Sequence, residues 1–352
     1  MAAYIIQLNH RNNFAIPLTL MDEKTPRYKY SMKPLFEQRM RSLIPNEADF
    51  QAFEKIVHTQ PKNFIRCNTI KTSPKELLEK LKQKWNVSQP FQNYPEIILV
   101  NQNLNPGELG NAIEHILGYY YIQEISSMLP VITLAPQSNE FILDLFASPG
   151  SKTTQIAAQM QNQGTILAND LKLDRIKILS TNLEKCGVTN TIVSRKDAVA
   201  LCSIISKSNL RFDKILLDTP CSGEGTLRSS PKTFLMWNHK VINKLSRQQK
   251  KFIAFALKCL KPLGTLVYST CTHAPEENEE IINFAIKNFP VKIESISLPL
   301  KCRQGITSWN EKLFNPETAK TCRIYPQDND SEGFFLAKLT LLKEMTLLHV
   351  WD

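Results

Sequence analysis

The chain has 352 residues, 42% of them hydrophobic and 22% charged, which is typical of a soluble globular protein with one large and one small domain. No apolar run is long enough to span a membrane, no secretory signal pattern opens the chain, and the eight cysteines form no CxxC pair. We therefore expect a cytoplasmic protein without a metal site or a disulfide scaffold. The net charge of +10 favours a polyanionic partner, most simply nucleic acid.

The chain begins with a polar, weakly patterned stretch, and we predict a peripheral lead-in segment over residues 1–30. Residues 31–118 then combine helical spacing of apolar residues with a strand-like run, which predicts a small α+β module. Its expected helices are "KPLFEQRMRSLI", "NEADFQAFEKIVHTQ" and "SPKELLEKLKQKW", the last with a Ser-Pro start, and its expected strand is "NFIRCNTI".

A different pattern covers residues 119–345, where short apolar runs alternate with helical segments. This alternation predicts an α/β domain with a parallel sheet that is covered by helices on both faces. The expected strands are 141–147, 164–170, 190–195, 212–218 and 264–270. The run "GFFLAKLTLL" (333–342) is expected to close the sheet as an edge strand.

Polar side chains follow the predicted strands at the points where they end. In parallel sheets ligands bind beyond the carboxyl ends of the strands, so these residues are the candidates for a site. They are Asp144, Asp170, Asp197, Asp218, Cys221 and Cys271.

The segment "DLFASPGSKTT" (144–154) predicts a strand, a tight turn and a helix whose free amides face the site. It is not a Walker loop, because Leu145 replaces the first glycine and Ser151 separates Gly150 from Lys152. The dinucleotide fingerprint GxGxxG is also absent. Asp170 can accept hydrogen bonds from ribose hydroxyls, and Asp197 can accept one from an adenine amine, so the residues at these strand ends fit an adenosine ligand. The alternative for Asp170 is that it caps the next helix.

Two cysteines follow strand tips, in "LLDTPCSGEGT" (216–226) and "GTLVYSTCTHAPEEN" (264–278). Carbon 5 of a pyrimidine becomes nucleophilic when a thiolate adds to carbon 6, and an acid such as Asp218 can stabilise the ring nitrogen. A methyl group from a sulfonium donor could then attach to carbon 5. The spacing alone does not say whether Cys221 or Cys271 attacks.

A basic run over residues 228–251 contains no Asp or Glu, which favours contact with an RNA backbone next to the site. Its cationic residues are Arg228, Lys232, Lys240, Lys244, Arg247, Lys250 and Lys251. A second basic cluster that could hold substrate comprises Arg27, Lys29, Lys33, Arg39 and Arg41. Phe234 and Trp237 fit core packing, with stacking on a base as the alternative.

Four motifs in order, "DLFASPGSKTT", "AND", "LLDTPCSGEGT" and "YSTCT…EEN", resemble the RNA cytosine-5 methyltransferases of the NOL/NOP/Sun family. The phrases "YYYIQEISSMLP", "GSKTTQIAAQM" and "DSEGFFLAKL" are most similar to its methyltransferase F branch. The resemblance covers residues 30–340.

The resemblance implies a Rossmann-like S-adenosylmethionine domain behind a ferredoxin-like RNA-binding module, acting as a monomer on structured RNA, with ribosomal RNA favoured. It implies that Cys271 attacks carbon 6, that Cys221 helps to release the product, and that Lys152 and Asp218 take part in the chemistry. The positions it implies for cofactor contact are Phe146, Ala147, Ser148, Pro149, Gly150, Ser151, Lys152, Asp170, Arg175, Asp197 and Asp218.

The sequence departs from the family pattern at Thr219 and Ser148, where alanine is usual, and it stops at Asp352, where methyltransferase F-like members continue with a further RNA-binding region. Transfer RNA is therefore an alternative substrate. Two other functions stay open: a catalytically silent RNA-binding or ribosome-assembly factor, and an S-adenosylmethionine enzyme acting on an exocyclic amine. The second needs no thiols, so the paired cysteines count against it.

Overall fold

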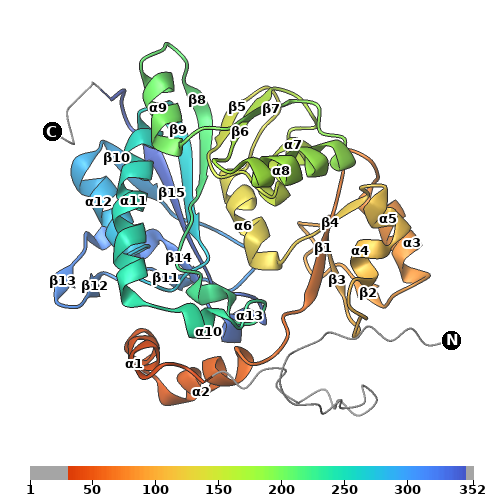
Figure 1. Ribbon diagram of the computed structural model, residues 1–352, viewed down its shortest axis with the longest axis horizontal. Helices are drawn as coiled ribbons and strands as arrows, with labels where there is room; N and C mark the ends of the chain where they lie inside the picture. The colour runs from red at the N-terminus through yellow and green to blue at the C-terminus, as the bar shows by residue number, and fades with distance from the viewer. Residues whose placement is uncertain (1–30, 346–352) are drawn as a thin grey trace.

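The computed structural model describes residues 31–345, so the predicted lead-in segment, with Arg27 and Lys29, lies outside the described residues. Its smaller sheet has four antiparallel strands in the order β2-β3-β1-β4 (Figure 1). The strands and accompanying helices are β1 (Asn63–Cys67), α3 (Pro74–Lys82), β2 (Val87–Ser88), β3 (Ile97–Val100), α4 (Glu108–Asn111), α5 (Ile113–Ile116) and β4 (Tyr120–Ile122). β4 lies beyond residue 118 in sequence and still pairs with β1.

Helix α3 shows why this sequence folds as it does locally. Ser73 accepts a hydrogen bond from the Glu76 amide while the Glu76 side chain accepts one from the Ser73 amide, and Pro74 occupies the first turn. Leu77 and Leu81 lie on the inner face of the helix and are buried with Ile65 of β1. The small sheet therefore has a hydrophobic core of its own.

Helices α1 (Pro34–Leu43) and α2 (Glu47–Ile56) share their core with the larger unit. Phe36 of α1 lies edge-on against Phe234 and Trp237, at ring-centroid distances of 6.4 and 5.4 Å. Phe234 and Trp237 are buried, which confirms core packing and excludes a free face for base stacking.

The larger sheet has the strand order β11-β14-β15-β9-β8-β5-β6-β7, with β10 paired to β15. Strands β9, β8, β5, β6 and β7 are parallel, and β15 is antiparallel to β9. The strands are β5 (Phe141–Asp144), β6 (Thr165–Asn169), β7 (Thr191–Ser194), β8 (Phe212–Asp218), β9 (Leu260–Thr270), β10 (Val291–Glu294), β11 (Arg303–Gln304), β14 (Cys322–Ile324) and β15 (Phe334–Leu341).

The position of β15 corrects the prediction of an edge strand. β15 pairs with β9 on one side and with β14 and β10 on the other. The strands beyond it are two to four residues long and lack the apolar run that marks a strand in the sequence. The sheet is therefore mixed.

Helices cover both faces of this sheet (Figure 1). One face carries α9 (Ala198–Ser206), α11 (His239–Leu257) and α12 (Glu279–Asn288), and the other carries α6 (Ile125–Leu134), α7 (Ser151–Gln159) and α8 (Leu173–Cys186). Successive residues of β5 point to opposite cores: Leu143 packs on the α11 side and Ile142 on the α6 side. None of the described helices is long and apolar enough to cross a membrane.

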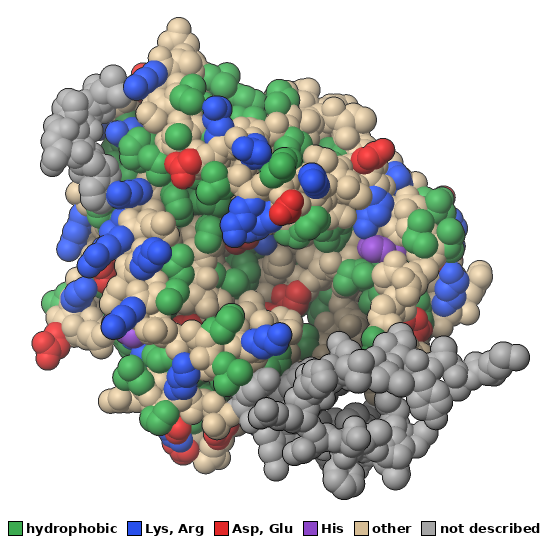
Figure 2. Space-filling model, viewed as in Figure 1, with side chains coloured by type: hydrophobic (Ala, Val, Ile, Leu, Met, Phe, Trp, Pro, Cys, Tyr) green, Lys and Arg blue, Asp and Glu red, His purple; other side chains and the backbone are tan. Residues whose placement is uncertain are grey.

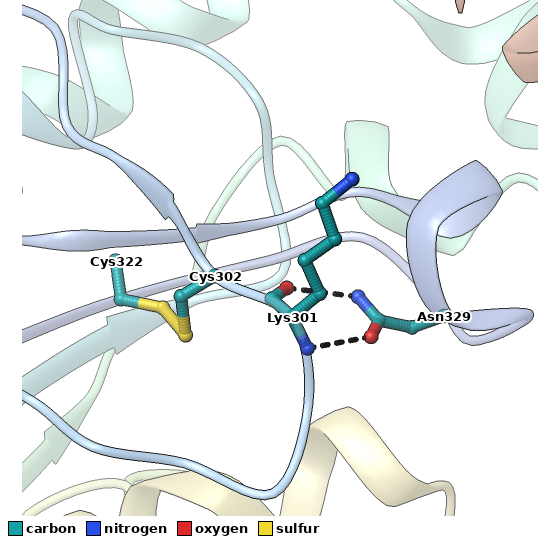
Figure 3. The surroundings of a disulfide bond; sticks show 4 residues. All are labelled: Lys301, Cys302, Cys322 and Asn329. Carbon is teal, nitrogen blue, oxygen red and sulfur yellow. Dashed lines mark hydrogen bonds between the residues drawn. A yellow bond between two sulfur atoms is a disulfide. The ribbon is translucent and has the colours of Figure 1, made fainter.

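A disulfide joins Cys302 to Cys322 across the start of β11 and β14 (Figure 3). Next to it, Asn329 donates to the carbonyl of Lys301 and accepts from the Lys301 amide. The sequence analysis does not predict this bond, because a spacing of 20 residues carries no disulfide signature.

Candidate active site

The carboxyl ends of β8 and β9 bring the two predicted cysteines together. Asp218, the last residue of β8, lies opposite Ser269 in the parallel register, so the loops that follow the two strands run side by side. Cys221 and Cys271 are both half-buried, and their sulfur atoms are 3.2 Å apart. The structure thus brings together two thiols that are 50 residues apart in the sequence.

The two cysteine loops are joined by one backbone hydrogen bond and one hydrogen bond between side chains. The Gly225 amide donates to the Cys271 carbonyl at 2.8 Å, and Ser222 Oγ lies 2.7 Å from Thr272 Oγ1. A β-carbon on Gly225 would lie 2.1 Å from the carbonyl oxygen of Gly333. Only glycine allows the "SGEGT" loop to pack this closely under the thiols.

The two sulfurs differ in their electrostatic surroundings. The contact with Cys271 raises the pKa of the Cys221 thiol, and burial and the nearby Glu277 carboxyl raise it further. Cys221 therefore keeps its proton and can donate it in a hydrogen bond to Cys271 Sγ. A thiolate rather than a thiol is the nucleophile, so the raised pKa disfavours Cys221 in that role.

Lys152 and Asp218 form an ion pair beside the thiols. Lys152 Nζ lies 2.8 Å from Asp218 Oδ2, and it donates to Ser127 Oγ at 3.0 Å. Ser269 Oγ donates to Asp218 Oδ1 at 2.7 Å. Lys152 reaches this point from the first turn of α7, so the turn after β5 and the tip of β8 meet here as the motifs predict.

The turn between β5 and α7 forms the adjoining part of the site. Gly150 has φ = +105°, a conformation that favours glycine, and an added β-carbon would lie 3.1 Å from Leu179 Cδ1. Ser148 Oγ donates to the Arg175 carbonyl, and Arg175 Nη2 donates to the Ser148 carbonyl. Phe146 packs against Phe252 of α11, with ring centroids 4.9 Å apart.

Three acidic side chains follow β5, β6 and β7 around this turn. Asp144 is buried, and burial raises its pKa to about 7; its Oδ2 accepts from Thr153 while Oδ1 has no partner among the described residues. Asp170 is buried, with Arg175 Nε 3.4 Å from its carboxylate. Asp197 is exposed and caps α9, accepting from the Val199 and Ala200 amides.

The predicted basic clusters are divided by the fold. Arg228 is 3% exposed and donates to Gln60, Asp330 and Ser331, so it is a structural residue. Lys250 pairs with Glu280. In the second cluster, Arg39 is buried against Glu276, Lys33 donates to the carbonyls of Leu235 and Trp237, and Arg41 pairs with Glu37 and Glu47.

Besides the exposed Lys232, what remains free is a stripe on α11, which we call the α11 stripe: Lys240, Lys244, Arg247 and Lys251. Their spacing places all four on one exposed helix face, and none of them has a carboxylate partner among the described residues. Figure 2 shows Lys and Arg side chains gathered over α11, beside a hollow near the centre of this face.

A buried polar layer lies beneath the thiols and was not predicted from the sequence. Glu224, Gln249, Glu277 and Asn278 are buried and hydrogen-bonded to the cysteine loops or to residues that hold them. Helix α12 begins at Glu279, so Glu277 and Asn278 lie in the segment between Cys271 and this helix. The only signal was the "EEN" run after the second cysteine, and a run of acidic residues normally indicates an exposed helix start.

The strand order, with five parallel strands and β15 antiparallel beside β9, defines a Rossmann-like α/β fold with the candidate site at the carboxyl ends of the parallel strands. In residues 31–345 no group of three or more His, Cys, Asp or Glu side chains is arranged as metal ligands.

Comparison with known proteins identifies the family. Residues 131–340 match the family model for the 16S rRNA methyltransferase RsmB/F, and residues 32–125 match the N-terminal domain of the 16S rRNA methyltransferase RsmF. The chain belongs to this family of RNA methyltransferases.

Individual relatives carry two kinds of name. The chain is 40% identical to a tRNA (cytosine(49)-C(5))-methyltransferase of Pyrococcus abyssi, over 83% of this chain and 92% of that protein. It is 35% identical to the ribosomal RNA small subunit methyltransferase F of Vibrio atlanticus, over 88% of this chain and 64% of that protein. A crystal structure of a Pyrococcus horikoshii methyltransferase homologue matches with a TM-score of 0.73 and 30% identity, over 84% of this chain and 91% of that one.

Proposed function

We propose that this protein transfers a methyl group from S-adenosylmethionine to carbon 5 of a cytosine in structured RNA, through a covalent adduct between Cys271 and carbon 6. The observation that carries the proposal is the 3.2 Å separation of the Cys221 and Cys271 sulfurs beside the Lys152–Asp218 pair. A methyl transfer to an exocyclic amine would need neither thiol. A catalytically silent factor would not require contacts between the two cysteines or between Lys152 and Asp218.

The attack begins with the Cys271 thiolate, which adds to carbon 6 of a cytosine flipped out of its stack. The new carbon–sulfur bond places electron density on the ring, and a proton at the ring nitrogen stabilises it. Asp218 lies where it can hold that proton, and the Lys152 ammonium at 2.8 Å can supply it through Asp218. Carbon 5 thereby becomes the nucleophile that accepts the methyl group.

Release reverses the addition. The carbon-5 proton is removed by a base, the electrons re-form the ring double bond, and the Cys271–carbon-6 bond breaks to return the thiolate. Cys221 is the group beside Cys271 that can take part in this step, because its sulfur is within 3.2 Å of the leaving sulfur. Its protonated state at rest keeps it from competing with Cys271 for carbon 6.

The residues around the turn after β5 fit S-adenosylmethionine, which supplies an electrophilic methyl group when bound. Asp170 follows β6 next to that turn and can accept ribose hydroxyls, and the first backbone amides of α7, directly after Gly150, can donate to the ligand. Asp144 Oδ1 is a buried acceptor with no partner among residues 31–345. Phe146, Ala147, Pro149, Ser151, Arg175 and Asp197 complete the proposed contact set.

Ribosomal RNA is the favoured substrate class, because both matched family models are of 16S rRNA enzymes. Transfer RNA is the second candidate, favoured by the 40% identity to a tRNA methyltransferase over 92% of that relative's length. Bisulfite sequencing of total RNA from cells with and without the protein separates the two. Loss of a protected cytosine in ribosomal RNA supports the first, and loss in transfer RNA the second.

The reaction itself is tested with substitutions of the two cysteines. Cys271→Ser should reduce methyl transfer to background while S-adenosylmethionine still binds, because a hydroxyl is a far weaker nucleophile than a thiolate. Cys221→Ser should instead let the protein–RNA adduct accumulate as a slowly migrating species on a denaturing gel. Retained turnover in Cys271→Ser would remove it as the nucleophile, and the absence of any adduct in Cys221→Ser would remove Cys221 from release.

A further inference from the structure

The two backbone groups that flank Cys221 are held from below by one buried pair of side chains. The amide of Ser222, directly after Cys221, donates to the Glu277 carboxylate, with 3.1 Å to Oε2. Gln249 Nε2 of α11 donates to Glu277 Oε2 at 2.8 Å and to the carbonyl of Pro220, directly before Cys221, at 2.9 Å. Glu277 and Gln249 together therefore fix both sides of the Cys221 residue.

Asn278, the residue after Glu277, holds the Cys271 loop in the same manner. Thr270 Oγ1 donates to Asn278 Oδ1 at 2.6 Å, and Asn278 Nδ2 donates to the Thr272 carbonyl at 2.9 Å. One side-chain amide thus contacts the residue before Cys271 and the residue after it. Glu277 and Asn278 are both 0% exposed, so water does not compete for these hydrogen bonds.

We propose that Glu277 and Asn278 are positioning residues that act as one clamp: Glu277 holds the Cys221 loop, Asn278 holds the Cys271 loop, and their adjacency sets the distance between the two sulfurs. Neither residue touches the reacting atoms. The catalytic consequence of the clamp rests on the proposed function above, while the clamp itself is a property of the protein alone.

The Glu277 carboxylate also distinguishes the two thiols. Its negative charge disfavours a thiolate at Cys221. The other groups that interact electrostatically with this region are Glu224, Arg39, Tyr268 and Asp218. Burial raises the pKa of Glu277 to about 7, so its charge acts on Cys221 mainly above that pH.

Glu277→Gln separates the charge from the hydrogen bonds. A glutamine oxygen in the position of Oε2 can still accept from both the Ser222 amide and Gln249 Nε2, so Gln249 also keeps its hydrogen bond to the Pro220 carbonyl. The probe is iodoacetamide on the Cys271→Ser background, with alkylation of Cys221 followed by peptide mass spectrometry at mildly alkaline pH.

Removing the charge should make Cys221 alkylation faster, by about threefold or more, since the thiolate is the reactive form. Glu280→Gln is the matched control, because it removes a carboxylate from the same segment that pairs with Lys250 and Lys312. An alkylation rate that is the same in Glu277→Gln and in the control would overturn the electrostatic part of the proposal.

Asn278→Ala tests the other half of the clamp. A displaced Cys271 should lower kcat for methyl transfer by about 100-fold, since misplacement by an ångström costs about that much, with S-adenosylmethionine affinity unchanged. Asn278→Asp keeps the acceptor for Thr270 and should lose less, which also covers a failure of the alanine variant to fold. Turnover within about threefold of wild type in both variants would rule out the clamp.

The two assays distinguish failure of the clamp from failure of the proposed function. Alkylation needs neither RNA nor S-adenosylmethionine, so it reports on Glu277 even if the wild-type protein methylates no RNA. Methyl transfer that is normal in wild type and normal in the Asn278 variants would contradict the clamp and leave the proposed function intact.

Discussion

Ionisable side chains buried around the site have pKa values far from their ordinary range. Burial raises the pKa of Asp144 to about 7, and burial together with Arg323 and Arg303 lowers the pKa of His273 to about 3. His273 lies parallel to Tyr325 at 4.9 Å, and its Nε2 has no hydrogen-bond partner in residues 31–345. Side chains in such surroundings contribute to the shape of a site at the expense of stability.

Asp144 allows a prediction on the pH dependence of stability. Its pKa rises from 3.8 to about 7 on folding, so between these values the folded state binds more protons than the unfolded state. The contribution of Asp144 to the free energy of unfolding should therefore decrease as pH rises from about 4 to about 7. Asp144→Asn removes this contribution.

The measurement is urea unfolding of wild type and Asp144→Asn across that pH range. The stability of the wild type relative to the variant should be greatest at the acid end and fall by an amount on the order of a few kcal/mol toward neutral pH. A difference between the two proteins that does not change with pH would contradict a raised pKa for Asp144.

The residues of the candidate site could be predicted to different extents. Cys221, Cys271, Asp218 and Lys152 occupy motifs at predicted strand ends, so their convergence follows from parallel strands ending at one edge. Glu277 could not be predicted as buried, because its chain neighbours Glu276, Glu279 and Glu280 look like the start of an exposed helix. Its burial is decided by α11, which is packed on it from a distant part of the chain.

Among the secondary-structure elements, the segment between β11 and β14 is the one least determined by local pattern. It contains the hairpin β12 (Ser308–Trp309) and β13 (Lys312–Leu313) and the short helix η3 (Pro316–Lys320), and the Cys302–Cys322 disulfide closes it as a loop. β14 carries Arg323, which pairs with Glu279 and donates to the His273 carbonyl. The loop thus supports the segment that follows Cys271.

Reduction of this disulfide should lower the free energy of unfolding. A closed loop with a sequence separation of 20 residues restricts the unfolded chain by about 3 kcal/mol in the chain-entropy model. Denaturant unfolding with and without a thiol-free reductant measures the difference. The Cys302→Ser/Cys322→Ser double variant should match the reduced protein and should no longer respond to reductant; equal stability of oxidised and reduced protein would refute the contribution.

For the molecule as a whole, the two sheets are joined at the site rather than at a distant linker. Arg66 of β1 is buried and donates to the Ser151 carbonyl at 2.7 Å and to Thr154 Oγ1 at 2.8 Å, both in the first turns of α7. The small sheet is thus attached to the helix that carries Lys152.

The α11 stripe leads to a prediction for RNA affinity. Each contact between a cationic side chain and a phosphate releases counterions. Replacing Lys240, Lys244 and Arg247 with alanine should therefore weaken RNA binding. It should also reduce the steepness with which the logarithm of the binding constant falls with the logarithm of the salt concentration, by about 2 to 3. Binding of structured RNA is measured by filter retention or anisotropy at several salt concentrations.

A matched control uses three cations near the amino ends of the parallel strands, away from the carboxyl ends that carry the candidate site. They are Lys207 after α9, Lys287 at the end of α12 and Lys292 in β10. Replacing these should leave the salt dependence close to that of the wild type although the net charge changes equally. An equal loss of RNA affinity in both triple variants would show that the overall charge, rather than the α11 stripe, attracts the RNA.

The sequence by itself determined the α/β alternation, the start of α3 at Ser73 and Pro74, and the residues at the strand ends, because hydrophobic period and turn chemistry are local properties of the chain. The tertiary structure decided that β15 lies inside the sheet, that α1 and α2 pack on the larger unit, and that Arg39 and Arg228 are buried while the α11 stripe is exposed. It also decided that Glu277 and Asn278 lie beneath the thiols. The reason is physical: burial and hydrogen-bond partners depend on segments far apart in the chain, and no local pattern encodes which of them will meet.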